Sequence, residues 1–597
     1  MRTLILTGAA LAALTGAARA ETARAGSAET VDELVVTAAR LPAVPAEIAA
    51  ARVIDAEEIA ARGSVFATDL LSTVPGVGVA RAGGPGGLAA IRIRGASPDK
   101  TLVLIDGVPM GDPSDPGGAF DAGTLQAADI SRIEVLSGPQ GSLWGSEAIG
   151  GVVSFTTREI DGAGAALEGG SYGTVRGFGG FGVTGDAGAL SASLTTLRSD
   201  GFSKAASGTE DDGLETVAAN LSGRWTVSPT VRLDARLRYS RARIEIDGFA
   251  PPAFLLGDTP AVARSRAWQG FARASVEALG LAHEVSLSAY DLRRESPSLF
   301  DADRTVLRWT AARGRALVAG IEHQESAADL SSGKRLDLSN TAVFAVGRAE
   351  LGRVTLTGSV RRDDPEAFQG RTTGRLAAAF DLGRGFTLTG AAGTGFKTPT
   401  ISQAVCDFCF RPAVPLRPER AEGQDLRFGW AGGGVSAALT GYRLLVRDQI
   451  SYTGGRYINI AKASSSGLEA ELSATLSEAL SMRLAYAWLD AVDRAAGRSL
   501  LRAPDHSGSA ALFWRDGRWS GALTARGEST QSDTARDGFS RIVRKGFVTA
   551  DVAAVYDLSD AISLSLRVEN LGDRRFSEVF GYREAGRSLY LGVRWKG

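Results

Sequence analysis

The chain has 597 residues, 44% of them hydrophobic, and after the N-terminus no apolar run approaches the ~20 residues that a membrane helix needs. Lys and Arg number 66 against 67 for Asp and Glu, and the two signs are interspersed, so no basic patch suggests nucleic-acid binding. Glycine reaches 74 while Cys is 2 and His and Met are 3 each, a composition that favours turns and strands over helix bundles.

The N-terminus predicts a secretory signal peptide over residues 1–20. Arg2 carries the positive charge, Leu4 to Ala18 is apolar, and small residues at Ala18 and Ala20 form a cleavage site. The stretch is too short to be a membrane helix. We therefore expect the mature chain to be exported into a compartment that permits disulfides.

Residues 21–50 are predicted as a flexible leader, in which Pro42 and Pro45 favour extended backbone. The leader contains one β-prone segment, made of Asp32, Glu33, Leu34, Val35, Val36, Thr37 and Ala38. Two interpretations are open. The segment is either a short edge strand of the next domain or an extended peptide that adds to the exposed sheet edge of a partner.

A small α/β domain is predicted over residues 51–158. Residues 55–62 and 68–77 indicate short helices, the second stopped by Pro75-Gly76. Ile91 and Ile93 alternate with arginines, as in a half-buried strand.

A buried strand is predicted over residues 102–105, ended by the turn signal Asp106-Gly107, and residues 133–155 hold two more strands around a glycine-rich loop. Residues 82–88 and 109–120 form loops rich in Gly and Pro. Neither loop has a Gly-Lys-Ser/Thr pattern with a following helix, so nucleotide binding is not expected.

These segments together resemble the plug domain of TonB-dependent outer-membrane receptors, with matches at 92–95, 102–107, 133–135, 138–139 and 145–152. The resemblance implies that the plug sits inside a barrel and that residues 32–38 are the TonB box, gripped by TonB through main-chain hydrogen bonds. It also implies that the two loops touch substrate. The expected contact residues are Gly83, Gly84, Pro85, Gly86, Gly87, Leu88, Met110, Asp112 and Ser114.

Residues 159–597 are predicted to form an all-β membrane barrel of about 22 antiparallel strands around the plug. Apolar and polar residues alternate in 231–239, 562–569 and 589–596. A soluble sandwich would also give this alternation, but no obvious helix covers the strands and the chain is exported. In hydrocarbon every backbone group must be paired internally, which for a sheet requires closure.

Turn sequences set the two ends of this barrel. Short turns are predicted at 227–230, 381–386, 476–481 and 558–563, on the periplasmic side, and longer polar stretches at 199–216, 245–265, 403–421 and 527–544 are predicted as outer loops. With ~10-residue spans, residues 160–597 suffice for 22 strands and their connections.

Catalysis is not expected, because His283, His323 and His506 are scattered and no Ser or Cys motif lies beside them. Haem receptors of the family generally use histidine ligands from plug and loops, and the plug here contains none. Passive diffusion is disfavoured by the plug and the coupling segment.

Two further stretches resemble the cobalamin branch of the family: residues 579–587, Val-Phe-Gly-Tyr-Arg-Glu-Ala-Gly-Arg, and the plug loop 83–88. Residues 395–399, 416–419 and 466–469 match the wider family. We therefore expect a TonB-dependent importer of cobalamin or a related corrinoid, with a ferric-siderophore receptor as the alternative. Expected partners are TonB, the corrinoid and outer-membrane lipids, with no nucleic acid, no required cofactor and a monomeric state.

The resemblance to cobalamin receptors also implies calcium in the outer loops. The expected ligands are Glu210, Asp212, Asp247 and Asp258, since a hard cation relieves the repulsion between gathered carboxylates. An ordinary solvated acidic loop is the alternative.

Two cysteines, Cys406 and Cys409, fall in the outer loop 403–421. A disulfide that staples the loop is expected, with metal ligation as the alternative. One departure from the family is the C-terminus, where Trp595 is followed by Lys596 and Gly597 instead of ending the chain on an aromatic residue.

Overall fold

The computed structural model describes residues 51–296, 299–329, 333–406 and 409–597. The predicted signal peptide, leader and TonB box therefore lie outside the described residues. Within the described ranges, no helix is both long enough and apolar enough to cross a membrane.

The first domain is built on a five-stranded sheet in the order β1-β6-β7-β4-β5, with β4 and β7 parallel and a separate hairpin of β2 and β3. Its core gathers apolar side chains of the helices α1 and α2 and of the sheet. The elements are β1 Ala51–Ile54, α1 Ala56–Arg62, α2 Ala67–Leu71, β2 Val77–Arg81, β3 Ala89–Ile93, β4 Thr101–Ile105, β5 Val108–Pro109, β6 Ile130–Ser137, α3 Gly141–Trp144 and β7 Gly151–Thr157, with 3-10 turns at Pro98–Lys100 and Ala127–Asp129.

Local chemistry explains these elements. Asp55 caps α1 by accepting from the backbone N–H of Glu58 at 2.8 Å, as its predicted start requires. Asp106 and Gly107 both have positive φ, 51° and 81°, which makes the tight turn between β4 and β5.

The predicted second helix is shorter than expected, because α2 ends at Leu71. The hydroxyls of Ser72 and Thr73 donate to the carbonyls of Asp69 and Leu70, each at 2.7 Å. Such local bonds offer the backbone an alternative to continued helix, and the chain turns into β2 instead.

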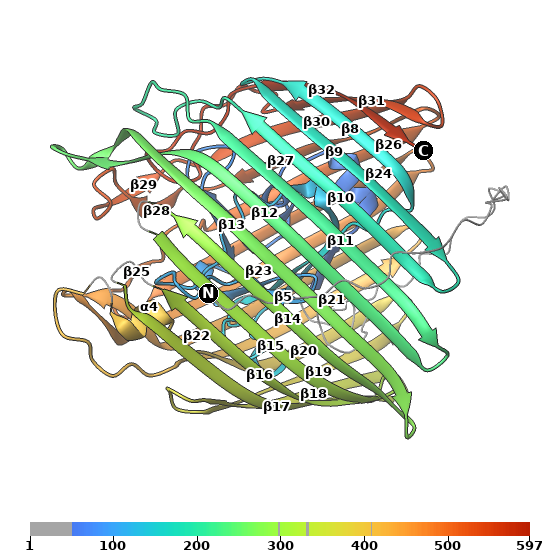
Figure 1. Ribbon diagram of the computed structural model, residues 1–597, viewed down its shortest axis with the longest axis vertical. Coiled ribbons are helices and arrows are strands. Elements are labelled where there is room, and N and C mark those ends of the chain that lie inside the picture. The colour runs from blue at the N-terminus through green and yellow to red at the C-terminus, as the bar shows by residue number, and fades with distance from the viewer. Residues whose placement is uncertain (1–50, 297–298, 330–332, 407–408) are drawn as a thin grey trace. The chain divides into compact units, whose positions relative to one another are not determined.

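The second domain is a closed antiparallel barrel (Figure 1). In the described part of the chain its closed order holds 23 strands, or 22 without the two-residue β25, which confirms the predicted fold. The strands are β8 Gly162–Gly170, β9 Thr174–Gly185, β10 Gly188–Ser199, β11 Leu214–Ser228, β12 Val231–Ala250, β13 Leu255–Ala278, β14 Leu281–Glu295, β15 Leu299–Arg313, β16 Leu317–Asp329, β17 Arg335–Leu351, β18 Val354–Pro365, β19 Arg371–Gly383, β20 Phe386–Lys397, β21 Glu419–Gly432, β22 Val435–Thr453, β23 Arg456–Ser477, β24 Leu480–Asp493, β25 Arg498–Ser499, β26 His506–Asp516, β27 Trp519–Glu528, β30 Phe547–Asp557, β31 Ile562–Glu569 and β32 Ser588–Lys596.

The last strand closes the barrel. Tyr590 to Lys596 of β32 pair with Gly170 to Gly164 of β8, so Lys596 belongs to the final strand. Along β32, Leu589, Leu591, Val593 and Trp595 face outward and exposed, while Tyr590 is buried. The predicted alternation of an apolar outer face and an inner face is confirmed here.

The four predicted short turns lie together at one end of the barrel, each between consecutive strands. At the other end the expected loops are partly wrong. Residues 245–265 are mostly strand, because β12 and β13 continue to pair beyond Gly248 and Gly257 and leave a turn of residues 251–254. Residues 527–544 contain a small hairpin of β28 Gln531–Thr534 and β29 Arg541–Arg544.

The first domain fills the lumen of the second. Its side chains bond to strands all round the closed order, including β12, β15, β18, β21, β23 and β27. We therefore refer to residues 51–158 as the plug.

Candidate functional site

The first plug loop, residues 82–88, packs against the barrel loop of residues 200–213. A Cβ at Gly83 would lie 2.5 Å from Cβ of Lys204, and one at Gly84 would lie 2.5 Å from Cζ of Phe202. Both glycines have positive φ, 84° and 57°, so these positions favour glycine for backbone as well as contact reasons.

The remaining residues of this loop differ in their surroundings: most pack against the barrel or the loop itself, and one is exposed. Gly86 faces Leu214, and Gly87 lies against the carbonyl of Ala82. Pro85 lines a small cavity at the barrel wall, while Leu88 is 61% exposed. Of the predicted contact residues in this loop, Leu88 is therefore the one whose side chain is open to the mouth.

The second plug loop, residues 109–120, is held by internal bonds. Asp112 accepts from the backbone N–H of Ser114 at 2.8 Å and from Nε of Arg294 at 3.2 Å. Met110 and Ser114 are each 1% exposed, with Met110 in the plug core. Both side chains are buried in this structure and do not reach the surface of the loop. Their contact with substrate therefore stays a prediction.

A cavity of about 80 Å³ lies where this loop meets the barrel. It is lined by Asp112 and Gly118 of the plug, by the lumen faces of β15 to β18, and by residues 396–401 at and after the end of β20. This outer cavity includes Glu147 and Arg304, which form an ion pair at 3.0 Å.

The run 579–587, singled out in the sequence, joins the plug to the barrel loop of residues 200–213. The backbone N–H of Gly84 donates to Oε1 of Glu584 at 3.3 Å, and that of Arg583 donates to the carbonyl of Lys204 at 2.8 Å. The carbonyl of Gly581 accepts from the backbone N–H of Ala206 at 2.8 Å. We call these contacts the clasp.

Glu584 contributes a buried carboxyl group to the clasp. Burial, followed by the neighbouring charge of Glu578, raises the pKa of Glu584 to about 8. Protonation of Glu584 weakens its carboxyl group as a hydrogen-bond acceptor, but it also avoids a negative charge in a buried position.

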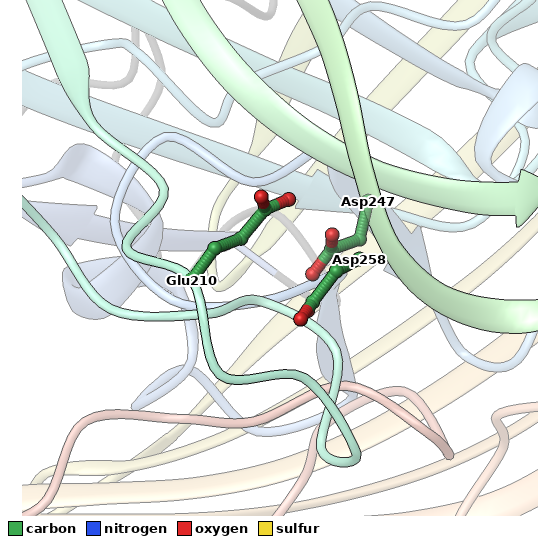
Figure 2. Close-up of side chains that lie close together, drawn as sticks. All are labelled: Glu210, Asp247 and Asp258. Carbon is green, nitrogen blue, oxygen red and sulfur yellow. The ribbon is translucent and has the colours of Figure 1, made fainter.

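Three acidic residues gather beside the clasp, as Figure 2 shows for Glu210, Asp247 and Asp258. One carboxylate oxygen of each lies within 4.8 Å of the others. The backbone N–H groups of Ala205 and Thr209 donate to Asp247 and Asp258, the second at 2.8 Å. Glu210 is exposed, and desolvation followed by the charges of Asp258 and Asp247 raises its pKa.

The fourth predicted calcium ligand has a different placement. Asp212 is buried, and its Oδ2 accepts from the backbone N–H of Lys204 at 2.6 Å. Burial is the largest cause that raises the pKa of Asp212, to about 6, with the charge of Asp247 adding to it. The structure therefore brings together three of the four predicted ligands, with Asp212 supporting the loop beside them.

Arg94 anchors the plug to the barrel. Its Nε donates to Oε1 of Glu469 at 2.8 Å, its Nη1 contacts Asp425, and its guanidinium lies 4.0 Å from the ring centroid of Tyr442. Arg94 has a φ of 53°, which is uncommon for a non-glycine residue. Gly76 is required nearby, because a Cβ there would lie 2.1 Å from Oε1 of Glu469.

Further ion pairs surround the plug. Lys100 lies 2.6 Å from Glu419, and Asp129 and Asp106 pair with Arg238 and Arg236 of β12 at 2.9 and 3.0 Å. Sequence reasoning did not single out these pairs. The alternation of arginines in β12 was a signal that they face the lumen, but their partners lie more than 100 positions away.

Comparison with known families gives two matches that together cover most of the chain. The TonB-dependent Receptor Plug Domain matches residues 45–152, and the TonB dependent receptor-like, beta-barrel family matches residues 154–571. The chain belongs to the TonB-dependent receptor family.

Solved structures of the same fold cover this receptor almost entirely. The ferric enterobactin receptor PfeA of Pseudomonas aeruginosa, solved as a single-site mutant, aligns with a TM-score of 0.80 at 18% identity over 94% of this chain and 100% of that one. The siderophore receptor PirA of Acinetobacter baumannii gives 0.79 at 17% over 92% and 98%. PirA of Pseudomonas aeruginosa gives 0.71 at 21% over 92% and 99%. At these identities the likeness establishes the fold.

TonB-dependent receptors are outer-membrane proteins that interact with TonB and bind a ligand. The exposed apolar face of the barrel is then the face toward lipid, and the lumen face carries the polar residues. The end with short turns corresponds to the periplasm, and the clasp and the acidic cluster lie at the outer mouth.

The two cysteines of this receptor form a disulfide, and each of the three histidines contacts a neighbouring side chain. Cys406 and Cys409, which follow α4 Ile401–Val405, are joined with Cα atoms 5.3 Å apart, the pairing that the sequence predicted. Nδ1 of His323 lies 2.9 Å from Oγ1 of Thr341, and Nδ1 of His506 lies 2.8 Å from the hydroxyl of Tyr486. His283 stacks on Trp309.

Proposed function

We propose that this receptor imports a scarce metal complex into the periplasm, driven by TonB through residues 32–38. The observation that carries the proposal is the plug, which fills a closed barrel and is bound to its wall by ion pairs. Passage then requires work on the plug, which an inner-membrane partner can supply. Polar contacts suit a plug that must move, since their partners can be exchanged for water.

For the ligand, we propose a ferric siderophore first. The solved receptors named above are described as ferric enterobactin and siderophore receptors, and they cover more than 90% of this chain. They favour the siderophore alternative of the sequence analysis over its main expectation, cobalamin. Because their identity with this chain is at most 21%, this support comes through the fold.

Cobalamin or a related corrinoid is the second candidate, and one local feature of the outer loops supports it. The acidic cluster and the clasp form where the resemblance to cobalamin receptors implies a calcium-ordered outer loop.

Equilibrium binding to the purified receptor separates the two candidates. We expect ferric enterobactin, or another ferric siderophore of a tested panel, to bind at sub-micromolar concentration while cyanocobalamin does not. Cyanocobalamin binding without siderophore binding would reverse the order of the candidates. Binding of neither would remove both ligand classes.

Coupling to TonB is tested in the leader. Strand addition needs free N–H groups and extended backbone, so Leu34→Pro or Val36→Pro should abolish uptake and leave binding at the cell surface unchanged. Ser27→Pro, outside the segment, is the matched control. Normal uptake in both variants of the segment would exclude residues 32–38 as the TonB box.

We also propose that Glu210, Asp247 and Asp258 bind calcium, a hard cation that takes six to eight oxygen ligands. Backbone carbonyls and water would complete the set. Calcium would stabilise loop 200–213, and a ligand that needs this loop would bind more tightly with calcium present.

Calorimetric titration with calcium alone tests the site. We expect binding that Glu210→Gln combined with Asp258→Asn removes, while Asp211→Asn, an exposed neighbour, leaves it unchanged. Equal heats for the wild type and the double variant would contradict the proposed site without affecting the transport proposal.

A further inference from the structure

Two cavities separate the plug from one side of the barrel wall. The outer cavity, described above, reaches residues 398–401 and Pro365 at the outer mouth. The inner cavity measures about 540 Å³ and reaches Pro229, Thr230 and Gly314 in the short turns at the periplasmic end. Its plug side is formed by the turn after β4 and by Ser154 and Thr156 of β7.

One strand lines both cavities without interruption. Successive residues of a strand point to opposite faces, so every second residue of β15 faces the lumen. Arg304, Val306 and Arg308 line the outer cavity, and Arg308, Thr310 and Ala312 line the inner one. The intervening Leu307 and Trp309 are exposed on the outer face of the barrel. The lumen face of β15 is thus a strip from the mouth to the periplasmic end.

Between the two cavities the strip is closed by one contact, and a second plug–wall contact, the ion pair of Glu147 with Arg304 at 3.0 Å, crosses the outer cavity. Trp144, the last residue of α3, and Arg308 are shared by both cavities, and the guanidinium carbon of Arg308 lies 5.4 Å from the centroid of a Trp144 ring. Arg308 also pairs with Glu322 at 2.6 Å, and Glu322 pairs with Arg361 at 2.8 Å. The closure therefore consists of a cation–π contact and an ion-pair chain on the barrel side.

The opposite side of the plug is arranged differently. There a third cavity, about 120 Å³, lies under the clasp and is lined by Thr524, Thr549 and Glu584. Among the described residues, it shares none of its lining with the other two cavities. The clasp joins the plug loop to the barrel loops on this side, which would resist separation of plug and wall.

From these observations we infer that the imported ligand passes along the lumen face of β15, between the wall and the plug elements β4, β5, β7 and α3. Trp144 and Arg308 form the gate, which opens when α3 moves away from the wall. The inference rests on the proposed function. It further implies a polar ligand that keeps part of its hydration, since arginines and carboxylates line the inner cavity, among them Arg232, Asp234, Arg236, Arg273, Glu277 and Glu284.

Cysteine labelling during uptake tests the route. Thr310→Cys or Ala312→Cys is treated in cells with a membrane-impermeant maleimide, with and without the probe that the binding experiment selects, ferric enterobactin or cyanocobalamin. We expect the probe to raise labelling several-fold when TonB is present and not when it is deleted. Thr549→Cys, in the third cavity, is the matched control and should not change. The parent chain, whose cysteines are paired, gives the background.

The gate is tested by a second pair of variants. Trp144→Ala should raise labelling of Thr310→Cys several-fold without any probe, and Trp144→Phe, which keeps a ring over Arg308, should not. Probe binding and heat-modifiable migration show that both variants are folded.

The outcomes separate route from function. Uptake with increased labelling at Thr549→Cys and none at Thr310→Cys or Ala312→Cys would overturn the route and leave transport intact. Unchanged labelling in Trp144→Ala would overturn the gate. Absence of uptake of every probe, measured in the same cells, would overturn the proposed function and the route with it.

Discussion

Single residues at the outer mouth decide how plug and loops are held together. Gly83 and Gly84 allow the plug loop to approach Lys204 and Phe202 more closely than any side chain would permit. Glu584 then accepts a hydrogen bond from the backbone of Gly84. The glycines that the family resemblance assigns to ligand contact therefore also serve the attachment of the loop to the barrel.

Glu584 makes the clasp sensitive to pH. Its folded-state pKa of about 8 lies above the ordinary glutamate value, so the folded loop keeps a proton that the released loop has lost. The corresponding stability is complete below the ordinary value and is lost as pH rises through 8. We expect limited proteolysis within residues 570–587 to become several-fold faster between pH 7 and pH 9.

Glu584→Gln is the control for this effect, because an amide of the same shape does not titrate. Its proteolysis rate should be independent of pH over this interval. A wild-type rate that is equally flat would show that Glu584 does not control release of the loop.

At the scale of elements, each barrel strand has a lipid face whose cost of substitution depends on depth. Leu591 lies near the middle of β32 and is 61% exposed. Leu591→Arg should destabilise the barrel by about 2–4 kcal/mol, because a charge would lie near the centre of the hydrocarbon. Urea unfolding in lipid vesicles, followed by Trp fluorescence, measures the change.

Leu558→Arg is the matched control, since Leu558 is exposed in a short turn after β30. The same chemical change near the interface should cost only about 0–1 kcal/mol. Equal losses in both variants would contradict the assignment of β32 to the membrane.

For the whole molecule, the ion pairs between plug and wall keep a wide barrel closed. Arg94→Ala would leave the buried Glu469 without its cation and would remove one of the two arginines beside Asp425, since Arg375 lies 3.7 Å away; breaking a buried ion pair costs about 3–5 kcal/mol in comparable sites. We expect this variant to conduct ions in planar bilayers and to sensitise cells to a large hydrophilic antibiotic.

Arg335→Ala is the control for Arg94. Arg335 pairs with Asp329 at 3.1 Å, but both side chains are about half exposed, so the pair contributes little. Conductance of Arg94→Ala no greater than that of Arg335→Ala would show that the plug is retained without this anchor.

The sequence by itself determined the classes of element and their order. Alternation with a period of two specified the strands, as in residues 589–596, and Asp106-Gly107 specified a turn that needs two positive φ angles. These signals are local, because they depend on neighbouring residues and on backbone sterics. The plug motifs added the resemblance to TonB-dependent receptors, and the two family matches confirmed membership of that family but not of its cobalamin branch.

Only the tertiary structure decided which distant residues meet. Glu210, Asp247 and Asp258 come together, with Asp212 directed to the backbone of Lys204, because the register of β12 and β13 and the clasp fix three loops at once. The partners of Arg94, the extension of β12 to Ala250 and the strip along β15 follow from closure of the barrel around the plug. Closure couples strands hundreds of residues apart, and no local pattern in the chain encodes which lumen-facing charge will find which partner.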